Sequence, residues 1–320
     1  MDLSVFFAGT GGSVPTSRRG LPALLISRGG ERILVDCGEG TQRQLLRSIG
    51  LADFDEIFLT HLHADHWLGL PGLLKTFDLR GRDTPLRIHG PRGLRDLIDG
   101  VMRYAGRTAY KLYLVELEPD ELLERDGYTI EVVPVSHRGP AFGYVLHEYD
   151  RPGVFDPAKA IAAGLTEGPE FGKLQRGETV NGVAPDQVMG PPREGRKLTI
   201  SGDTRPSEAL KLAAEGSDVL IHEATFAIEE AERAHLTGHS TASQAAGIAK
   251  NADVRLLVLN HLSIRYPAAQ LRDEATEIFP DTVLPRDFDT VEIPFPERGR
   301  PELRRWSESE TPAVGADTLP

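Results

Sequence analysis

The chain has 320 residues, of which 40% are hydrophobic and 26% are charged, as is usual for a folded globular protein. Its net charge of −12 argues on average against a polyanionic partner, although a local basic patch can override an average. No apolar run reaches the roughly 20 residues that cross a bilayer. The N-terminus lacks a signal peptide, and the single Cys37 excludes an internal disulfide. These features predict a cytoplasmic protein without a membrane segment.

Strand-like and helix-like runs alternate along the chain, which predicts an α/β fold with sheets covered by helices. The expected strands are residues 3–8, 32–36, 56–59, 86–89, 129–135, 197–201, 219–222 and 256–260. The expected helices are residues 41–49, 67–79, 93–104, 207–216, 241–251 and 268–279. No internal repeat is visible, so the elements belong to one continuous fold rather than to a repeat array.

Metal-binding side chains crowd the segment that follows the strand expected at residues 56–59. This segment contains His61, His63, Asp65 and His66, three imidazoles and one carboxylate. Zinc and similar divalent ions prefer these groups as ligands. In an extended backbone, alternate residues such as His61 and His63 point the same way. The spacing therefore predicts a metal site at the end of a buried strand, and a purely structural role for all four residues is the weaker interpretation.

Three more potential ligands follow apolar strands later in the chain, namely His137, Asp203 and His261. Each alone is a weak signal, but strand ends at one edge of a sheet converge in space. Seven ligands suit two metal ions if one carboxylate bridges them, and two ions about 3.5–4 Å apart can clamp a displacement at phosphorus. The predicted ligand set is His61, His63, Asp65, His66, His137, Asp203 and His261.

Two regions depart from the α/β rhythm. Residues 151–196 are rich in Gly and Pro, with little periodicity, which is typical of a functional or flexible insert. Its basic residues are Arg151, Lys159, Lys173, Arg176, Arg193 and Arg196. Residues 299–320 are polar and rich in Pro and Ser, which predicts a disordered tail.

The order H-x-H-x-D-H followed by His, Asp and His at strand ends resembles the metallo-β-lactamase superfamily. A finer resemblance, running from Gly9 to about Pro285, is to the ribonuclease Z family of tRNA 3′-processing endonucleases. The motifs that carry it are Asp36-Cys37-Gly38-Glu39-Gly40-Thr41-Gln42, Ser201-Gly202-Asp203-Thr204, His222-Glu223-Ala224-Thr225, Gly238-His239-Ser240-Thr241 and His261-Leu262-Ser263-Ile264-Arg265-Tyr266. The resemblance implies a four-layer αββα sandwich over residues 1–298, with residues 151–196 as a protruding flexible arm.

The same resemblance implies an activity and a set of partners. The implied enzyme removes the 3′ trailer from precursor tRNA with two Zn²⁺ per subunit, or Mn²⁺ or another divalent ion in their place. The products are a tRNA with a 3′-hydroxyl and a trailer with a 5′-phosphate. The short form of the family is a homodimer in which one subunit's arm serves the other's active site.

The resemblance also assigns roles to single residues. Asp65 acts as a ligand and proton acceptor, His239 contacts the scissile phosphate, and Glu223 orients that imidazole. Ser240 and Thr241 are expected to cap the helix behind His239, whose N-terminus favours anions. The residues implied to contact the substrate are Gly168, Pro169 and Lys173 on the arm and Arg265 and Tyr266 near the site.

The loop at residues 9–20 departs from the family pattern, since Ser17 and Gly20 stand where many members have Lys and Asn. The cleavage position and the range of RNA substrates therefore stay open. A different hydrolase on the same fold, such as a phosphodiesterase, an arylsulfatase-like enzyme or a lactonase, is the main alternative and would need no arm. A non-catalytic RNA-binding or sensor protein is the second, and the complete ligand set argues against it.

Overall fold

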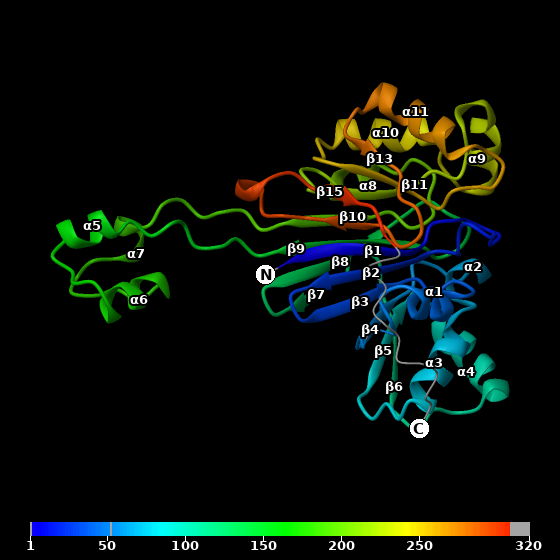
Figure 1. Ribbon diagram of the computed structural model, residues 1–320, viewed down its shortest axis with the longest axis horizontal. Coiled ribbons are helices and arrows are strands. Elements are labelled where there is room, and N and C mark those ends of the chain that lie inside the picture. Colours follow the sequence, from blue (N-terminus) through cyan, green and yellow to red (C-terminus); the bar gives the residue numbers. More distant parts are fainter. Residues whose placement is uncertain (1, 52, 308–320) are drawn as a thin grey trace.

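Two β-sheets packed face to face form the centre of the protein, and helices cover their outer faces (Figure 1). The computed structural model describes residues 2–51 and 53–307. The first sheet has the order β15-β14-β1-β2-β3-β4-β5-β6. Its strands are β1 Leu3–Gly9, β2 Ala23–Arg28, β3 Glu31–Val35, β4 Glu56–Phe58, β5 Leu86–Gly90, β6 Leu112–Glu116, β14 Thr290–Glu292 and β15 Glu302–Arg304.

The second sheet has the order β13-β12-β11-β10-β9-β8-β7. Its strands are β7 Leu122–Arg125, β8 Tyr128–Pro134, β9 Phe142–Glu148, β10 Lys197–Ile200, β11 Val219–Glu223, β12 Leu257–Asn260 and β13 Thr282–Val283. The helices of the body are α1 Thr41–Arg47, α2 Ala64–Trp67, α3 Leu70–Leu79, α4 Leu94–Ala105, α8 Glu208–Ala213, α9 Ala231–Thr237, α10 Ala242–Asn251 and α11 Ala268–Ile278, with 3-10 turns η1 Ile228–Glu230 and η2 Pro296–Arg298. No helix in the described part of the chain is long and apolar enough to cross a bilayer.

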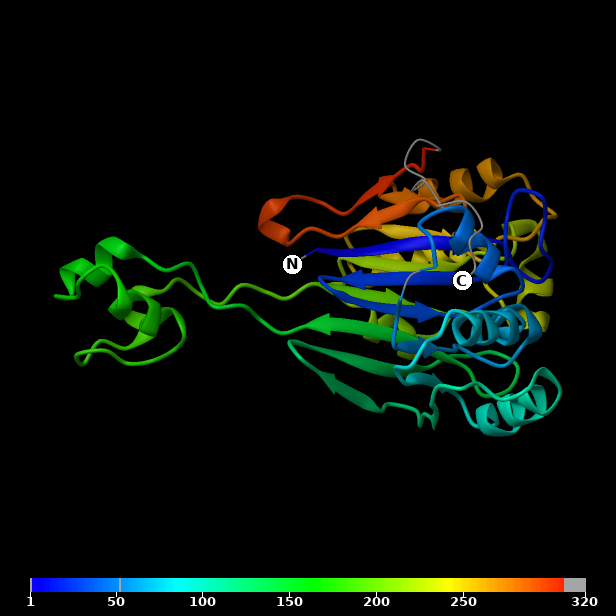
Figure 2. The same ribbon diagram turned by 60° about the horizontal axis from the view of Figure 1, so that its bottom comes forward.

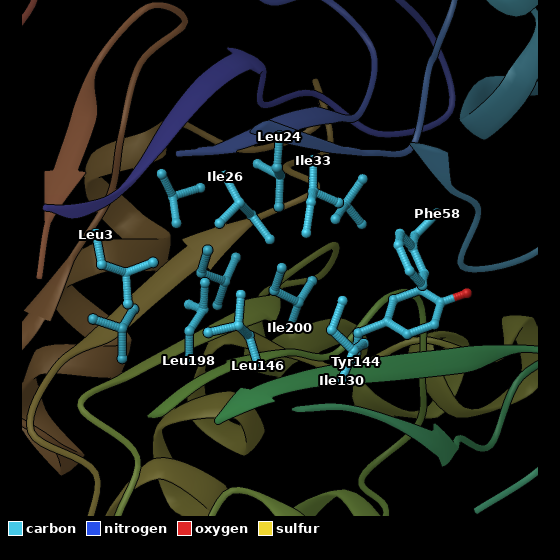
Figure 3. Close-up of a cluster of buried hydrophobic side chains, with 14 of the residues drawn as sticks. Leu3, Leu24, Ile26, Ile33, Phe58, Ile130, Tyr144, Leu146, Leu198 and Ile200 are labelled. Carbon is cyan, nitrogen blue, oxygen red and sulfur yellow. The ribbon is translucent and has the colours of Figure 1, made fainter. Parts of the chain in front are cut away.

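Side chains that point alternately to the two faces of each strand build the layers. Leu24 and Ile26 of β2 point into the core between the sheets, where Figure 3 shows them facing Leu146, Leu198 and Ile200 of the second sheet. The side chain between them in sequence, Leu25, points to the other face and joins the cluster under α1 and α3. Because successive side chains of a strand point to opposite faces, one strand serves two layers. The predicted αββα sandwich is confirmed.

Parallel strands place several loops together. Strands β3, β4 and β5 run parallel in the first sheet, and β10, β11 and β12 run parallel in the second. The carboxyl ends of neighbouring parallel strands lie at the same edge of a sheet, which is where binding sites of α/β proteins form. The loops after β4, β8, β10, β11 and β12 meet at this end of the sandwich.

The insert at residues 151–196 leaves the body as the long connection of the β9–β10 hairpin and lies well away from both sheets (Figures 1 and 2). We call it the arm. It is more ordered than its sequence predicts, because it carries helices α5 Pro157–Ala162, α6 Pro169–Gln175 and α7 Pro185–Val188. These pack around a small core of their own, formed by Ala160, Leu165, Phe171, Leu174, Val180, Val183 and Val188. Helices this short give no readable hydrophobic period.

The sequence predicts that the disordered tail begins at residue 299, but the chain stays ordered beyond that point. Residues 302–304 form β15, which pairs with β14 through Val291 and Leu303. Beyond it, the indole of Trp306 lies edge-on to Phe6, with ring centroids 6.3 Å apart. The backbone pairing and the aromatic contact hold this segment on the sheet in spite of its polar composition. The rest of the predicted tail, residues 308–320, lies outside the described residues.

Candidate metal and catalytic site

Three imidazole nitrogens converge at the end of β4. His61 Nε2 lies 3.0 Å from His63 Nδ1, and His137 Nε2, from the loop after β8, lies 3.0 Å from the same atom. The extended backbone between β4 and α2 turns His61 and His63 to one side, as their spacing predicts. The three side chains form one potential metal-binding group, which we call group A.

A second set of ligand atoms lies beside the first. Oδ2 of Asp65 is 3.4 Å from Nε2 of His261, and Nε2 of His66 is 3.3 Å from the same nitrogen. Asp65 and His66 lie in α2, whereas His261 follows β12 in the other sheet. These residues form group B. Ser13, from the loop after β1, donates its backbone N–H to Oδ2 of Asp65 over 2.8 Å.

Asp203 stands between the two groups. Its Oδ2 lies 3.8 Å from His61 Nε2 in group A, and 3.4 Å and 3.3 Å from the Nε2 atoms of His66 and His261 in group B. One carboxylate therefore faces both groups, which is the arrangement of a bridging ligand. All seven predicted ligands meet here, although they come from both sheets and are separated by up to 200 residues in sequence, from His61 to His261.

The chemistry of these side chains fits divalent metal ions. Tetrahedral zinc with bonds of about 2.0–2.1 Å to nitrogen places its ligand atoms about 3.3 Å apart, close to the spacing in group A. Burial, with the nearby His66, lowers the pKa of His61, which favours the neutral imidazole that a metal needs. Burial alone would lower the pKa of His66 too, but Asp203 and Asp36 raise it. The same carboxylates that raise this pKa make the site favourable for a positive charge.

Neighbouring groups fix the orientation of the potential ligands. Asp36 Oδ2 lies 2.8 Å from His66 Nδ1, and Thr225 Oγ1 lies 2.8 Å from His261 Nδ1. The Nδ1 atom of His137 lies 2.6 Å from the carbonyl oxygen of Gly238. In each case the second ring nitrogen is bonded, so that Nε2 faces the centre, as is usual for metal-binding histidines. The sequence prediction gave these partners no role.

Two residues of the site adopt the left-handed backbone conformation. Asp36 has φ 60° and His261 has φ 56°, a region that non-glycine residues adopt infrequently. At Asp36 the turn brings the carboxylate under the next strand, where Thr60 donates its backbone N–H to Oδ1 over 2.8 Å. Local strain of this kind persists where surrounding contacts determine the conformation.

His239 and Glu223 form a pair beside the two groups. Nδ1 of His239 lies 2.9 Å from Oε1 of Glu223, and its ring centroid is 5.0 Å from that of His137 and 5.5 Å from that of His261. Burial lowers the pKa of His239, but Glu223 outweighs this effect and raises it to about 9. Of the two predicted capping residues after His239, Thr241 caps α10 and forms a capping box with Gln244, whereas the hydroxyl of Ser240 donates to the carbonyl oxygen of Thr204 instead.

The residues predicted to contact substrate lie in two separate places. Tyr266 lines a cleft of about 1320 Å³ with Ser17 and Gly20 of the loop at residues 9–20, and its hydroxyl donates to Glu230. Arg265 forms an ion pair with the same Glu230, at 3.8 Å. In contrast, Gly168, Pro169 and Lys173 lie in or beside α6 at the tip of the arm, away from groups A and B (Figure 1).

The basic residues of the arm are less available than their number suggests. Arg151 and Arg193 pair with Glu297 of the body, and Arg196 is buried against Glu148. The tip carries Lys159, Lys173 and Arg176, and of these Lys159 and Arg176 face Asp156 and Glu178. Half of the basic side chains therefore hold the root of the arm, and the other half lie towards its tip.

Comparison with known proteins agrees with this geometry. The family model described as metallo-beta-lactamase superfamily matches residues 19–261. The chain is 44% identical to a ribonuclease Z of Halorubrum lacusprofundi, covering 93% of this chain and 99% of that protein. It is 43% identical to a ribonuclease Z of Gemmatimonas aurantiaca, over 93% and 98% of the two chains.

A solved structure is also similar. The human tRNase Z, short form, superposes with a TM-score of 0.68 at 29% identity, covering 91% of this chain and 99% of the human one. Identity above 40% over nearly the full length of both chains extends beyond the fold to the finer family. This chain belongs to the ribonuclease Z family, short form, within the metallo-β-lactamase superfamily.

Proposed function

We propose that this protein is a metal-dependent endoribonuclease that removes the 3′ trailer from precursor tRNA, leaving a 3′-hydroxyl on the tRNA and a 5′-phosphate on the trailer. The observation that carries the proposal is the His239–Glu223 pair beside two metal-binding groups that share Asp203. A two-metal phosphodiester hydrolase uses metal ligands together with a separate, oriented proton donor, and residues suited to both roles are present. Membership of the ribonuclease Z family supports the choice of RNA as substrate.

Two Zn²⁺ per subunit are the proposed cofactors, with Mn²⁺ or another divalent ion as the alternative. His61, His63 and His137 would hold one ion, Asp65, His66 and His261 the other, and Asp203 both. When bound, two such ions activate water near neutral pH and offset charge on the reacting phosphate. The near-tetrahedral spacing of the group A nitrogens and the single carboxylate between the groups support this assignment.

The chain's own residues then handle the protons. Because Nδ1 of His239 faces Glu223, its Nε2 is the atom left to face the substrate. With a pKa raised to about 9, the imidazole carries a proton at neutral pH that it can give to the leaving 3′-oxygen. Asp65 is proposed to accept a proton on the opposite side, besides serving as a ligand. The capped N-terminus of α10, directly after His239, favours the negative charge of a phosphate.

The arm is the proposed tRNA-binding exosite, with Gly168, Pro169 and Lys173 as contacts, and Arg265 and Tyr266 as contacts near the cut. The arm leaves β9 and β10 at the end of the second sheet opposite to Asp203, which follows β10. Figure 1 shows this separation, with the arm at one end of the molecule and α9 at the other. An arm that points away from its own metal groups supports a homodimer in which it serves the partner's site. We propose that this homodimer acts in the cytoplasm.

The decisive experiment uses a precursor tRNA of defined sequence and maps both product ends, with and without a chelator. We expect one cut at the 3′ end of the acceptor stem that chelator abolishes and added zinc restores. Cleavage that ignores the chelator, or products with the opposite end chemistry, would overturn the proposal.

A shortened arm separates this function from a small-molecule hydrolase on the same fold. Asp156 donates its backbone N–H to Val188 over 2.8 Å, so a short Gly/Ser linker can replace residues 157–187 without disturbing the root. We expect the shortened protein to lose precursor tRNA cleavage and to keep hydrolysis of bis-para-nitrophenyl phosphate. Unchanged tRNA cleavage would favour the alternative hydrolase.

A further inference from the structure

The root of the arm is gripped by the segment between β14 and β15. Two residues of this segment make the contacts, Phe295 and Glu297, and we call them the clamp. The arm consists of an outgoing and a returning segment of the polypeptide, which we call its two chains. They are paired here, since Arg151 and Arg193 exchange backbone hydrogen bonds of 2.7 Å and 2.8 Å. The clamp therefore meets the arm where its outgoing and returning chains lie side by side.

Glu297 joins the two chains by charge. Its carboxylate accepts two hydrogen bonds from Arg151 on the outgoing chain, at 2.8 Å and 3.0 Å, and one from Arg193 on the returning chain, at 3.4 Å. The bonds from Arg151 lower the pKa of Glu297 to about 2, so the carboxylate stays ionised at neutral pH. A two-pronged arginine–carboxylate pair fixes direction as well as distance.

Phe295 adds a stacked contact. The guanidinium carbon of Arg151 lies 3.4 Å from the centre of its ring, and that of Arg196 lies 4.0 Å from it. An aromatic face attracts a guanidinium, and more strongly when water is excluded. Phe295 is 9% exposed, so the ring is largely enclosed by these contacts.

Arg196 connects the clamp to the rigid body. Its side chain is 1% exposed and donates to Glu148 at 2.7 Å and 2.9 Å, and to the carbonyl oxygen of Ile293 at 2.8 Å. Glu148 also pairs with Arg28 of β2, at 2.9 Å. The series of contacts from Arg151 through Phe295 to Arg196 is thus anchored in the first sheet, through Glu148 and Arg28.

The stalk beyond the clamp is narrow. A Cβ atom placed on Gly153 would lie 1.9 Å from the carbonyl oxygen of Gly190 on the opposite chain. The two chains can therefore approach closely enough to move as one strip. Stacking on Phe295 and the ion pairs of Glu297 hold the two chains at the root, so the arm keeps its direction relative to the body. Without these contacts, an arm of this length would change its direction freely.

We propose that Phe295 and Glu297 are positioning residues that fix the direction of the arm relative to its own body, and thereby set where the arm's tip lies relative to the partner's metal groups in the proposed homodimer. This rests on the proposed function only where it concerns tRNA: an exosite held at one distance would select substrates in which the bound elbow and the cut site are separated by that distance. The fixed direction itself is a property of the protein without RNA.

The first experiment measures direction without any substrate. Spin labels at Gln175→Cys in α6 and Lys250→Cys in α10 report the separation of tip and body, and Cys37 does not interfere because it is fully buried. We expect a narrow distance distribution that broadens at least about twofold in Glu297→Gln and in Phe295→Leu. The control is Glu302→Gln, which removes the same charge from the neighbouring strand β15. Equal widths in all four proteins would overturn the clamp.

The second experiment asks whether direction matters to the reaction. With precursor tRNA, Glu297→Gln should raise KM about three- to tenfold and leave kcat within about twofold, because the metal groups are untouched. With bis-para-nitrophenyl phosphate, both constants should match those of the unchanged protein and of Glu302→Gln. A loss of kcat on both substrates would contradict a positioning role. If precursor tRNA is not cleaved at all, the proposed function fails, while the label distances still decide the clamp.

Discussion

Oε1 of Glu223 lies 2.9 Å from Nδ1 of His239, and the carboxylate that makes this contact is only 2% exposed. Three further donors hold it: the backbone N–H groups of Thr204 and Thr225, at 2.9 Å and 3.2 Å, and the hydroxyl of Thr225, at 2.6 Å. A carboxylate bonded on both oxygens cannot rotate. The imidazole is therefore held in one orientation before any substrate arrives, which reduces the reorganisation that the reaction needs.

Removal of this imidazole should slow the chemical step. We expect His239→Ala to lower kcat about 10²- to 10⁴-fold, the usual contribution of a positioned proton donor. Zinc content should stay at the level of the unchanged protein. The control is His235→Ala, which removes an exposed imidazole from α9. Single-turnover cleavage and metal analysis measure both quantities, and a His239→Ala protein with full kcat would show that His239 has no part in proton transfer.

Loss of a metal ligand should change metal content as well as rate. His63 is exposed at its position before α2, so His63→Ala should fold normally. We expect its zinc content to fall by about one ion per chain and cleavage to disappear, since each catalytic zinc needs three protein ligands. An exposed histidine of β9 provides the control, as His147→Ala. Full activity in His63→Ala would refute the assignment of group A.

The partner of a ligand should matter almost as much as the ligand. Asp36→Asn keeps the shape of the side chain but removes the charge that lies 2.8 Å from Nδ1 of His66. We expect zinc affinity to fall about 10- to 100-fold, as is common for such partners. Competition with a coloured chelator measures this, with the exposed Asp53→Asn as the control. Equal affinities in the two variants would mean that His66 needs no orientation by Asp36.

Acid should destabilise the protein partly through Glu148. Burial would raise the pKa of Glu148, but its hydrogen bonds and ion pairs with Arg196 and Arg28 outweigh burial and lower it. The unfolded chain therefore takes up this proton at higher pH than the folded chain. The stabilisation is complete above the ordinary carboxyl pKa and is lost as the pH falls through that value towards the folded one.

Denaturant unfolding at about pH 7 and about pH 4 tests this. Glu148→Gln should lower the free energy of unfolding at neutral pH by about 3 kcal/mol, because the buried Arg196 and the partly buried Arg28 lose their partner. It should then lose less stability than the unchanged protein on going to the acid pH. The exposed Glu277→Gln is the control. An identical acid loss in Glu148→Gln and Glu277→Gln would contradict the assignment.

Much of the site could be predicted because ligands sit next to strands in the sequence. His61, Asp203 and His261 each follow an apolar run, and the end of a strand is a local feature that can be read directly. The orienting partners could not be predicted this way. Asp36 meets His66 across 30 residues, and Gly238 meets His137 across 101. Such pairs depend on how the two sheets stack, which no local pattern encodes.

The arm and the tail are more ordered than their composition predicts. Composition predicted irregular structure for residues 151–196, yet short helices there bury Phe171 and Leu174 in a local core. In the tail, residues 302–304 pair with β14, and Leu303, the apolar residue among them, packs against the core between the sheets. In both places a few specific contacts between side chains or backbones decided the structure, and composition averages over such contacts.

The arm is the connection of a single hairpin, and that arrangement bears on how such proteins diversify. Closing a longer loop costs little extra entropy, so an insertion between β9 and β10 can grow, shrink or be exchanged as one cassette. The seven proposed metal ligands all lie outside this segment. With the arm as the proposed exosite, selection can alter which RNA shapes are recognised while the proposed metal ligands stay unchanged.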